Sequence, residues 1–251
     1  MMFNMLRVLN LKKYFGGVKA VDNCSFSVSR NSITALIGPN GAGKTTAFNL
    51  ISGLLKSDSG EIQLSDHDIS RIGAHKRALR GISRTFQQVR LFSNLTVEEN
   101  LLLSLNGEDG DFFKLFKKES DHTKAINSVL EAVGLHDLPQ NKRGAELSYG
   151  QTKLVGLARA LLMPHKILML DEPVAGVNPV LRERLKNIIL ELKANGETVL
   201  LIEHDMDFVM SVADNIIVMA EGKVLANGSP SEIKQNQQVL DAYLGKEVQT
   251  A

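Results

Sequence analysis

The stretch GPNGAGKTT, residues 38–46, constrains the fold of this chain more than any other feature. It directly follows ITALI (33–37), a short β-branched run that predicts a buried strand, and it opens TTAFNLISGLL (45–55), which predicts a helix. This strand–loop–helix order is the context that the pattern G-x-x-x-x-G-K-[ST] requires. Its glycines let backbone N–H groups turn toward phosphate oxygens, and the helix N-terminus adds a positive dipole end. The sequence therefore predicts a phosphate-binding loop at a strand end; the alternative is a glycine turn that binds nothing.

The loop also supplies a cation and a hydroxyl group. Lys44 can reach the β- and γ-phosphates of a nucleotide, and the Thr45 hydroxyl can ligate Mg²⁺. The residues that we expect to hold the nucleotide in this loop are Gly38, Asn40, Gly41, Gly43, Lys44, Thr45 and Thr46.

Two more apolar runs end in polar side chains. ILMLDEP (167–173) places Asp171 where it can hold Mg²⁺ through its water shell, and Glu172 where it can polarise an attacking water. VLLIEHDM (199–206) places His204 where it can hydrogen-bond a γ-phosphate oxygen. The alternatives are an acidic strand end at the surface and a loop histidine. With the phosphate loop present, we expect these side chains to gather at one edge of the sheet.

Two shorter segments carry weaker signals. RTFQQVRLF (84–92) places Gln87 at the entry to a helical segment, where its amide can touch Mg²⁺ or the lytic water without a change of charge. KKYFGG (12–17) has two adjacent aromatic rings, one of which can stack on adenine. A polar surface residue and a core aromatic are the respective alternatives.

Strand and helix patterns alternate at both ends of the chain, which predicts an α/β sheet. Strand-like runs recur at 166–171, 198–203 and 215–220, whereas the pattern of the segment at about 90–163 predicts mostly helix. We therefore expect one domain over 1–251, with a core of about 1–89 and 164–251 and a helical insertion at about 90–163. Within the core, Asn178 is the expected cap of a helix over 178–196, and Ser229 begins a capping box.

Charge and composition exclude some classes of protein. The 29 basic and 28 acidic residues give a net charge of +1, so no global field favours nucleic acid. Cys24 is the only cysteine, which rules out an internal disulfide and indicates a core thiol. No apolar run approaches the ~18 residues that span a bilayer, and MMFNMLRVLN is too short and mixed for a signal peptide. We expect a cytoplasmic protein that reaches a membrane only through a partner.

A second segment with the features of a phosphate-binding loop lies about a hundred residues after the first. AELSYGQTK (145–153) has no catalytic base or metal ligand, but Ser148 and Gly150 at a helix start offer a hydroxyl, N–H groups and a dipole to a phosphate. It falls in the helical insertion, which we expect to be too far away to close on Lys44 of the same chain. The alternative is a plain helix with Ser148 as its cap.

Together these segments resemble the nucleotide-binding subunits of ABC transporters, in the order that this family has them. GPNGAGKTT resembles Walker A, FQQ the Q-loop, LSYGQ the signature loop, ILMLDE Walker B, AGVN (175–178) the D-loop and EHD the H-loop. The resemblance implies a P-loop NTPase fold of the ABC type, with an antiparallel β subdomain and an inserted helical subdomain, that hydrolyses ATP with Mg²⁺. It also favours Phe15 over Tyr14 as the adenine-stacking ring.

The resemblance implies a particular division of roles. Two such domains dimerise head to tail, so Ser148, Gly150 and Gln151 would contact the ATP held by the other subunit's Walker A. The implied catalytic residues are Glu172, His204, Lys44 and Gln87, and the implied metal ligands are Thr45, Gln87 and Asp171.

Tyr149 stands where the family usually has glycine, and Asn178 where the D-loop usually has aspartate. Both features are similar to those of the ATPase subunits of branched-chain amino-acid importers, as are the segments LFSNLTVEENL, HDMDFVMSVAD and VLDAYLG. Those subunits carry extra residues at the position of 106–120 in this chain. The partners this implies are a second ABC ATPase subunit, identical or different, two permease subunits and a substrate-binding protein, on the inner face of the membrane.

Other members of the family stay open as alternatives: a urea or amide importer, or the lipopolysaccharide-extracting machine. A soluble ABC protein acting on ribosomes or DNA usually has two ATPase domains or long coiled coils, whereas this chain has one Walker A and no heptad array. A nucleotide kinase or GTPase would not explain LSYGQ or His204.

Overall fold

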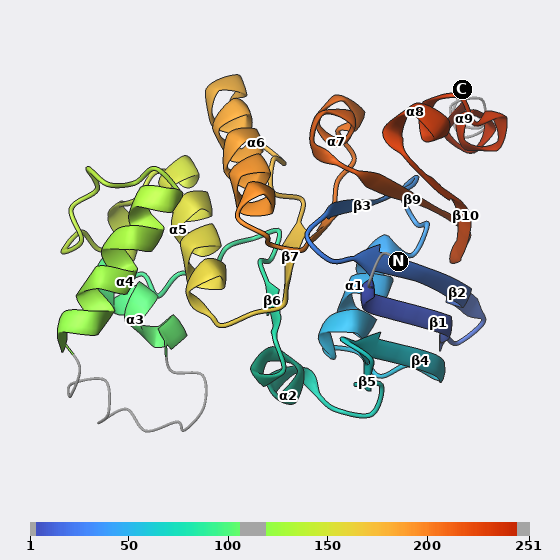
Figure 1. The fold of residues 1–251 in the computed structure, drawn as a ribbon, viewed down its shortest axis with the longest axis horizontal. Coiled ribbons are helices and arrows are strands. Elements are labelled where there is room, and N and C mark those ends of the chain that lie inside the picture. The colour runs from blue at the N-terminus through green and yellow to red at the C-terminus, as the bar shows by residue number, and fades with distance from the viewer. Residues whose placement is uncertain (1–3, 106–118, 245–251) are drawn as a thin grey trace.

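The computed structural model describes residues 4–105 and 119–244, which form two sheets flanked by helices (Figure 1). The smaller sheet is antiparallel and has the strand order β2-β1-β4-β5. Its strands are β1 Asn4–Phe15, β2 Val18–Ser29, β4 Ser59–Leu64 and β5 His67–Asp68. This is the antiparallel β part that the resemblance implied.

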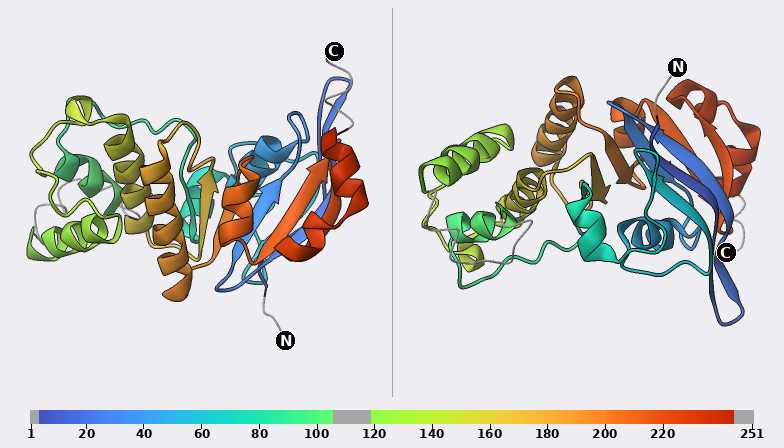
Figure 2. Two further views of the ribbon diagram at one scale, coloured as in Figure 1. Left: turned by 90° about the horizontal axis from the view of Figure 1, so that it is seen from above. Right: turned by 60° about the horizontal axis from the view of Figure 1, so that its bottom comes forward.

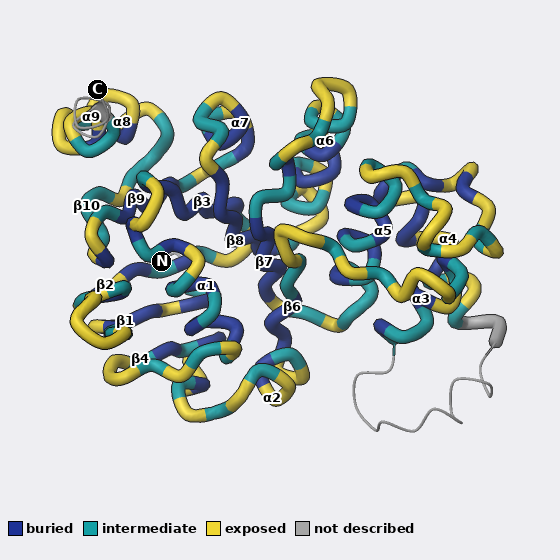
Figure 3. The backbone as a smooth tube through the Cα atoms, turned by 180° about the vertical axis from the view of Figure 1, so that it is seen from behind, coloured by how far each residue is buried: buried dark blue, intermediate teal, exposed yellow. Residues whose placement is uncertain are grey.

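The larger sheet has the order β10-β9-β3-β8-β7-β6, and all its strands are parallel except the edge strand β10. Every residue of β3, β7 and β8 is buried, as expected for parallel strands covered on both faces (Figure 3). The strands are β3 Ile33–Ile37, β6 Ile82–Arg84, β7 Ile167–Asp171, β8 Val199–Ile202, β9 Asn215–Ala220 and β10 Lys223–Gly228.

Side chains alternate between two hydrophobic cores on the faces of the larger sheet. Ile33, Ala35 and Ile37 belong to the core that packs against α3 to α8, whereas Leu36 belongs to the core shared with α1 and the antiparallel sheet. The helix after the phosphate loop, α1 (Lys44–Ser52), is therefore fixed between two sheets.

The remaining helices lie mainly beyond one face and one end of the larger sheet. In Figures 1 and 2, α3, α4 and α5 stand together at the end of the molecule farthest from the antiparallel strands. The helices are α2 Ala74–Leu79, α3 Val97–Leu105, α4 Glu119–Ala132, α5 Tyr149–Leu162, α6 Pro179–Ala194, α7 Met206–Val212, α8 Pro230–Lys234 and α9 Gln237–Leu244, with a short 3₁₀ turn η2 Gly144–Glu146.

Helix boundaries follow local capping chemistry. The run 45–55 was expected to be wholly helical, but α1 ends at Ser52 because Gly53 takes a left-handed conformation with φ 78°. The expected caps are present: the Asn178 side chain accepts a hydrogen bond from the Leu181 N–H, and Ser229 forms a capping box with Glu232.

Other expectations about segments have mixed outcomes. The strands β6 and β10 and the helices α2 and α7 were not anticipated from the sequence. Most of the segment 106–120, expected to carry extra residues, lies outside the described residues. None of the helices within 4–105 and 119–244 is both long and apolar enough to cross a bilayer.

Candidate active site

The phosphate loop connects β3 to α1 and requires glycine for steric reasons. A Cβ atom on Gly38 would lie 2.1 Å from the Met219 carbonyl oxygen, and one on Gly43 would lie 2.1 Å from the Ala20 carbonyl oxygen. Both glycines also have positive φ values, 147° and 95°. The loop backbone can therefore approach its neighbours only because these positions have no side chain.

Lys44 begins α1 and folds back over the loop. Its Nζ donates hydrogen bonds to the Gly38 carbonyl at 2.6 Å and to the Pro39 carbonyl at 3.1 Å. The side chain is buried, with only 9% of its surface exposed. The ammonium group is thus held at the loop where phosphate oxygens would bind.

A cavity of about 680 Å³ opens over this loop. The walls come from the β1–β2 side (Val18, Asp22), from the β9–β10 turn (Glu221, Lys223) and from Glu172 after β7. Its floor is the loop itself, with Asn40, Gly41, Gly43, Lys44, Thr45 and Thr46. All of the phosphate-loop residues expected from the sequence line this cavity except Gly38, which is not among the described residues that line it.

Glu172 reaches the cavity from an unusual backbone conformation. Its φ of 47° lies in the left-handed region, which a residue with a side chain adopts at a cost of about 1–3 kcal/mol. Its Oε2 accepts a hydrogen bond of 2.6 Å from Gln87 Nε2. The structure therefore brings together Gln87 and Glu172, which are 85 residues apart in the sequence.

Asp171 has a partner that sequence reasoning missed. Arg84 Nη2 donates to Asp171 Oδ2 at 2.7 Å, and the two side chains are only 7% and 9% exposed. Arg84 also donates to Asn49 Oδ1 and Ser52 Oγ on α1, both at 2.8 Å. One arginine thus joins the end of β7 to the helix that follows the phosphate loop. In the sequence, the only sign was its place three residues before Gln87.

His204 is mostly exposed after β8, next to a buried carboxylate. The Glu203 side chain is fully buried and accepts the Val174 N–H at 2.8 Å and the His204 N–H at 3.2 Å. Burial raises the pKa of the Glu203 carboxyl, although these N–H bonds act in the opposite direction. Glu203 therefore ties the segment after Glu172 to the segment that carries His204, a role the sequence did not reveal.

The two aromatic residues before Gly16 have different environments. The Tyr14 hydroxyl donates to Asp22 Oδ1 at 2.6 Å, and this bond raises the pKa of Tyr14 and lowers that of Asp22. Phe15 is 47% exposed, with the Lys13 ammonium 5.4 Å from its ring centroid. The Tyr14 hydroxyl is already bonded to Asp22 of the same chain, whereas the Phe15 ring is exposed and accessible to a ligand.

The second loop begins α5 and is separate from the cavity. Ser148 Oγ accepts the Gln151 N–H at 3.2 Å, and Gln151 Oε1 accepts the Ser148 N–H at 3.0 Å. Among the described residues that line the cavity, none comes from this loop. The Tyr149 hydroxyl instead donates to the Ala175 carbonyl at 3.1 Å.

A phosphate loop at the end of the parallel strand β3, with an acidic pair at the end of β7, two strands away in the same sheet, defines the class of P-loop nucleoside triphosphatases. Comparison with known proteins narrows this class. Residues 21–175 match the family described as ABC transporter, and residues 223–249 match the family described as branched-chain amino acid ATP-binding cassette transporter.

Curated relatives match over almost the whole chain. One is the high-affinity branched-chain amino acid transport ATP-binding protein BraF of Pseudomonas aeruginosa, 40% identical over 96% of this chain and 98% of its own length. Another is LivG of Escherichia coli K12, a protein of the same description, at 41% identity with the same coverage.

Solved structures agree with these relatives. The ADP conformation of an ATP-binding cassette of an ABC transporter is 39% identical, with a TM-score of 0.84 over 96% of this chain and 99% of that one. A dimeric cassette in a post-hydrolysis state, bound to ADP and Pi, is 25% identical, with a TM-score of 0.79 over 90% and 99%. The chain belongs to the ABC transporter family, as one of its ATP-binding, ATP-hydrolysing subunits, and both the family and the fold expected from the motifs are confirmed.

Proposed function

We propose that this chain binds and hydrolyses ATP to drive an importer of branched-chain or related amino acids. The observation that carries the proposal is the cavity that the phosphate loop and Glu172 line together. The match of residues 223–249 to a family described by branched-chain amino acids, and the descriptions of BraF and LivG, support the cargo.

ATP occupies the cavity with its phosphates on the loop. Lys44 Nζ exchanges its two carbonyl partners for β- and γ-phosphate oxygens, and the backbone N–H groups of the loop bind the same charge. Phe15 stacks on adenine, which its open ring supports.

Bound with the nucleotide, Mg²⁺ would neutralise phosphate charge. The Thr45 hydroxyl, the Gln87 amide oxygen and Asp171 are the oxygen donors that fit a hard cation. One oxygen of Asp171 accepts a hydrogen bond from Arg84, and the carboxylate would hold the ion through its water shell.

Glu172 acts as the general base toward the attacking water. Gln87 holds its carboxylate from one side, and His204 hydrogen-bonds the γ-phosphate. Catalysis then rests on positioning and charge neutralisation, as phosphoryl transfer requires.

The second loop completes the site of another subunit. Ser148, Gly150 and Gln151 do not line the cavity of their own chain, which supports their action on the ATP of a partner. The dimeric cassette among the similar structures supports such an arrangement. The partner is a second ABC ATPase, either a copy of this chain or a related one.

The ATPase pair acts on permease subunits and, through them, on a substrate-binding protein. The chain sits on the cytoplasmic face of the membrane through the permeases and binds no nucleic acid. We assign 1–251 to one domain, in which α3, α4 and α5 belong to an inserted helical subdomain at about 90–163 and relay motion from Gln87.

A tagged chain, purified from membranes with its partners, tests this proposal. Reconstituted into vesicles with ATP inside and binding protein outside, the complex should accumulate labelled leucine or valine only when ATP is hydrolysed. Uptake of urea or short amides instead, or extraction of lipopolysaccharide, would change the assigned cargo but leave the assignment as a transport ATPase intact. Absence of any ATP-dependent movement would contradict the transport role.

A further inference from the structure

The backbone segment that follows Glu172 is held by side chains of α5, the helix that the second loop begins. Lys153 Nζ donates to the Glu172 carbonyl at 3.1 Å and lies 3.5 Å from the Pro173 carbonyl oxygen. The Tyr149 hydroxyl donates to the Ala175 carbonyl at 3.1 Å. One face of one helix thus binds three carbonyls within the segment 172–175.

The burial of Lys153 makes this contact informative. The side chain is only 7% exposed, and its ammonium lies 5.7 Å from the centroid of the Tyr149 ring. A buried cation is costly unless its hydrogen bonds are satisfied, and the partners found for it within the described residues are these carbonyls and this ring. A methionine would fill the same space without that cost.

The segment that is held has a conformation that needs support. Glu172 has a φ of 47°, and its carbonyl accepts the Ala175 N–H at 3.2 Å as well as Lys153 Nζ. The backbone conformation of Glu172 sets the direction of its carboxylate. A strained conformation of this kind persists only where the surrounding structure fixes it.

The start of α5 is also fixed against α6. A Cβ atom on Gly150 would lie 2.9 Å from Leu181 Cδ2, so the two helices approach closely at this point. Tyr149 and Lys153 thus connect the second loop, through α5, to the backbone of the segment 172–175.

We propose that Tyr149 and Lys153 are positioning residues for ATP hydrolysis, which hold the Glu172 backbone from within the same chain. The inference rests on the proposed role of Glu172 as general base. It gives the second loop a role toward its own subunit in addition to its role toward the partner. It also accounts for a tyrosine at 149, because the hydroxyl of this side chain donates to the Ala175 carbonyl and a glycine there has no donor to offer.

The test measures kcat, KM and the Kd for ATP in the purified complex. Lys153→Met removes the donors while keeping the length, and Tyr149→Phe removes only one hydroxyl from a half-exposed ring. Because misplacement by about 1 Å can cost ~10²-fold, we expect Lys153→Met to lower kcat by about 10- to 100-fold and Tyr149→Phe by several-fold. The Kd for ATP should stay within about twofold, because the phosphate loop is untouched.

Three controls give the result its meaning. Lys153→Arg keeps donors at this position and should recover most of the kcat. Lys186→Met makes the same chemical change where the lysine contacts Glu183 on α6, and it should leave kcat unchanged. The double variant of Tyr149 and Lys153 should lose less than the product of the single effects, because both residues hold one segment.

Unchanged kcat in both single variants would overturn the inference, and so would equal changes in kcat and Kd. If Lys153→Met does not fold, Tyr149→Phe decides alone. Glu172→Gln in the same assay separates the two proposals: if it remains active, the role of Glu172 fails; if it is inactive while Tyr149→Phe and Lys153→Met are normal, only the positioning role fails.

Discussion

The buried pair of Arg84 and Asp171 yields a stability prediction whose size follows from the structure. Arg84→Met keeps an unbranched stem beside Phe48 but leaves the Asp171 carboxylate, 9% exposed, without its cation. Removal of one partner from a buried pair costs about 3–5 kcal/mol. Because the two side chains are only 7% and 9% exposed, solvent screening reduces this cost only slightly. For a chain of this size, that corresponds to a loss of roughly 6–20 °C in Tm.

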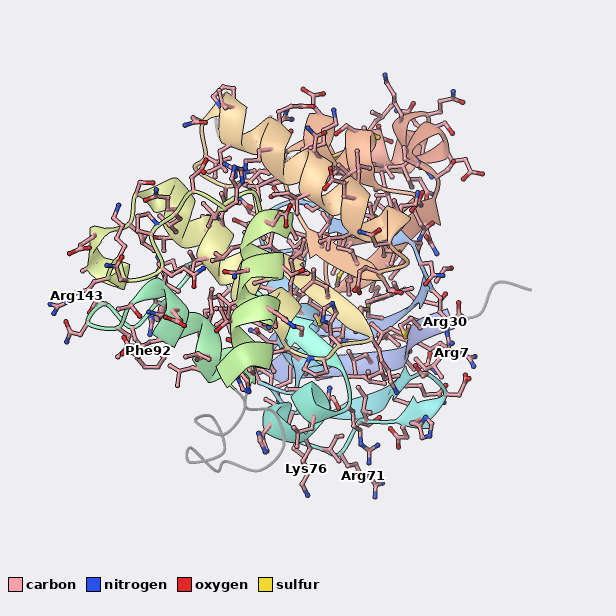
Figure 4. All side chains as sticks on the ribbon, turned by 60° about the vertical axis from the view of Figure 1, so that its left-hand side comes forward. Arg7, Arg30, Arg71, Lys76, Phe92 and Arg143 are labelled. Atoms are coloured by element: carbon pink, nitrogen blue, oxygen red, sulfur yellow. The ribbon has the colours of Figure 1, made fainter. Side chains whose placement is uncertain are left out.

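Urea denaturation followed by circular dichroism measures the loss, with Arg71→Met as the matched control. Arg71 projects from the surface near α2 (Figure 4), so its replacement should change stability by less than about 0.5 kcal/mol. Adding Asp171→Leu to Arg84→Met removes the orphaned charge and should recover part of the loss. A loss below about 1 kcal/mol for Arg84→Met alone would refute the argument that this pair is a buried, mutually dependent one.

The remaining predictions concern the nucleotide, the second loop and the single cysteine. Phe15→Ala should raise the Kd for ATP several-fold and Phe15→Tyr should not, in line with a stacking energy of about 0.5–1.5 kcal/mol; weaker binding by Tyr14→Ala alone would show that the other ring stacks. Ser148→Arg should abolish hydrolysis but not ATP binding, and paired with a partner whose Walker A lysine is disabled it should leave one working site, detected by nucleotide trapping at Lys44 of this chain. Absence of trapping at Lys44, the result expected if each second loop acted on its own subunit, would contradict action across the dimer. Burial raises the pKa of Cys24 to about 12, so a thiol reagent at pH 8 should label the unfolded chain but not the native one. The stabilising effect of that neutral thiol is complete below its ordinary pKa and is lost as the pH rises toward 12; rapid labelling of native protein would contradict its burial.

Local patterns predicted the elements whose chemistry is local. The strand 33–37 has the predicted bounds because a short β-branched run followed by a glycine loop leaves little choice. Asn178 and Ser229 cap helices as expected, because capping depends on residues three positions apart. The helix α1 is shorter than the run 45–55 because Gly53 adopts a left-handed conformation that ends it.

Contacts between segments far apart in the chain could not be predicted from the sequence. Arg84 meets Asp171 across 87 positions, and Glu203 meets Val174 across 29, because neighbouring strands and loops bring them together. No spacing rule predicts such pairs before the sheet order is known. The sequence likewise marked Tyr149 only as a departure from its family, whereas its hydrogen bond to Ala175 depends on how α5 sits beside the end of β7.

The most direct test of the central claim is ATP turnover by the complex that carries Glu172→Gln. The substitution keeps the size of the side chain and leaves the phosphate loop intact, so ATP should bind with an unchanged Kd. Loss of the general base should slow hydrolysis by about 10²–10⁴-fold. The isolated subunit that carries the same substitution should accumulate as an ATP-bound dimer, seen as a doubled mass by light scattering. Normal turnover, or loss of ATP binding together with turnover, would contradict the assignment of Glu172 as the base of an ATP-hydrolysing transporter subunit.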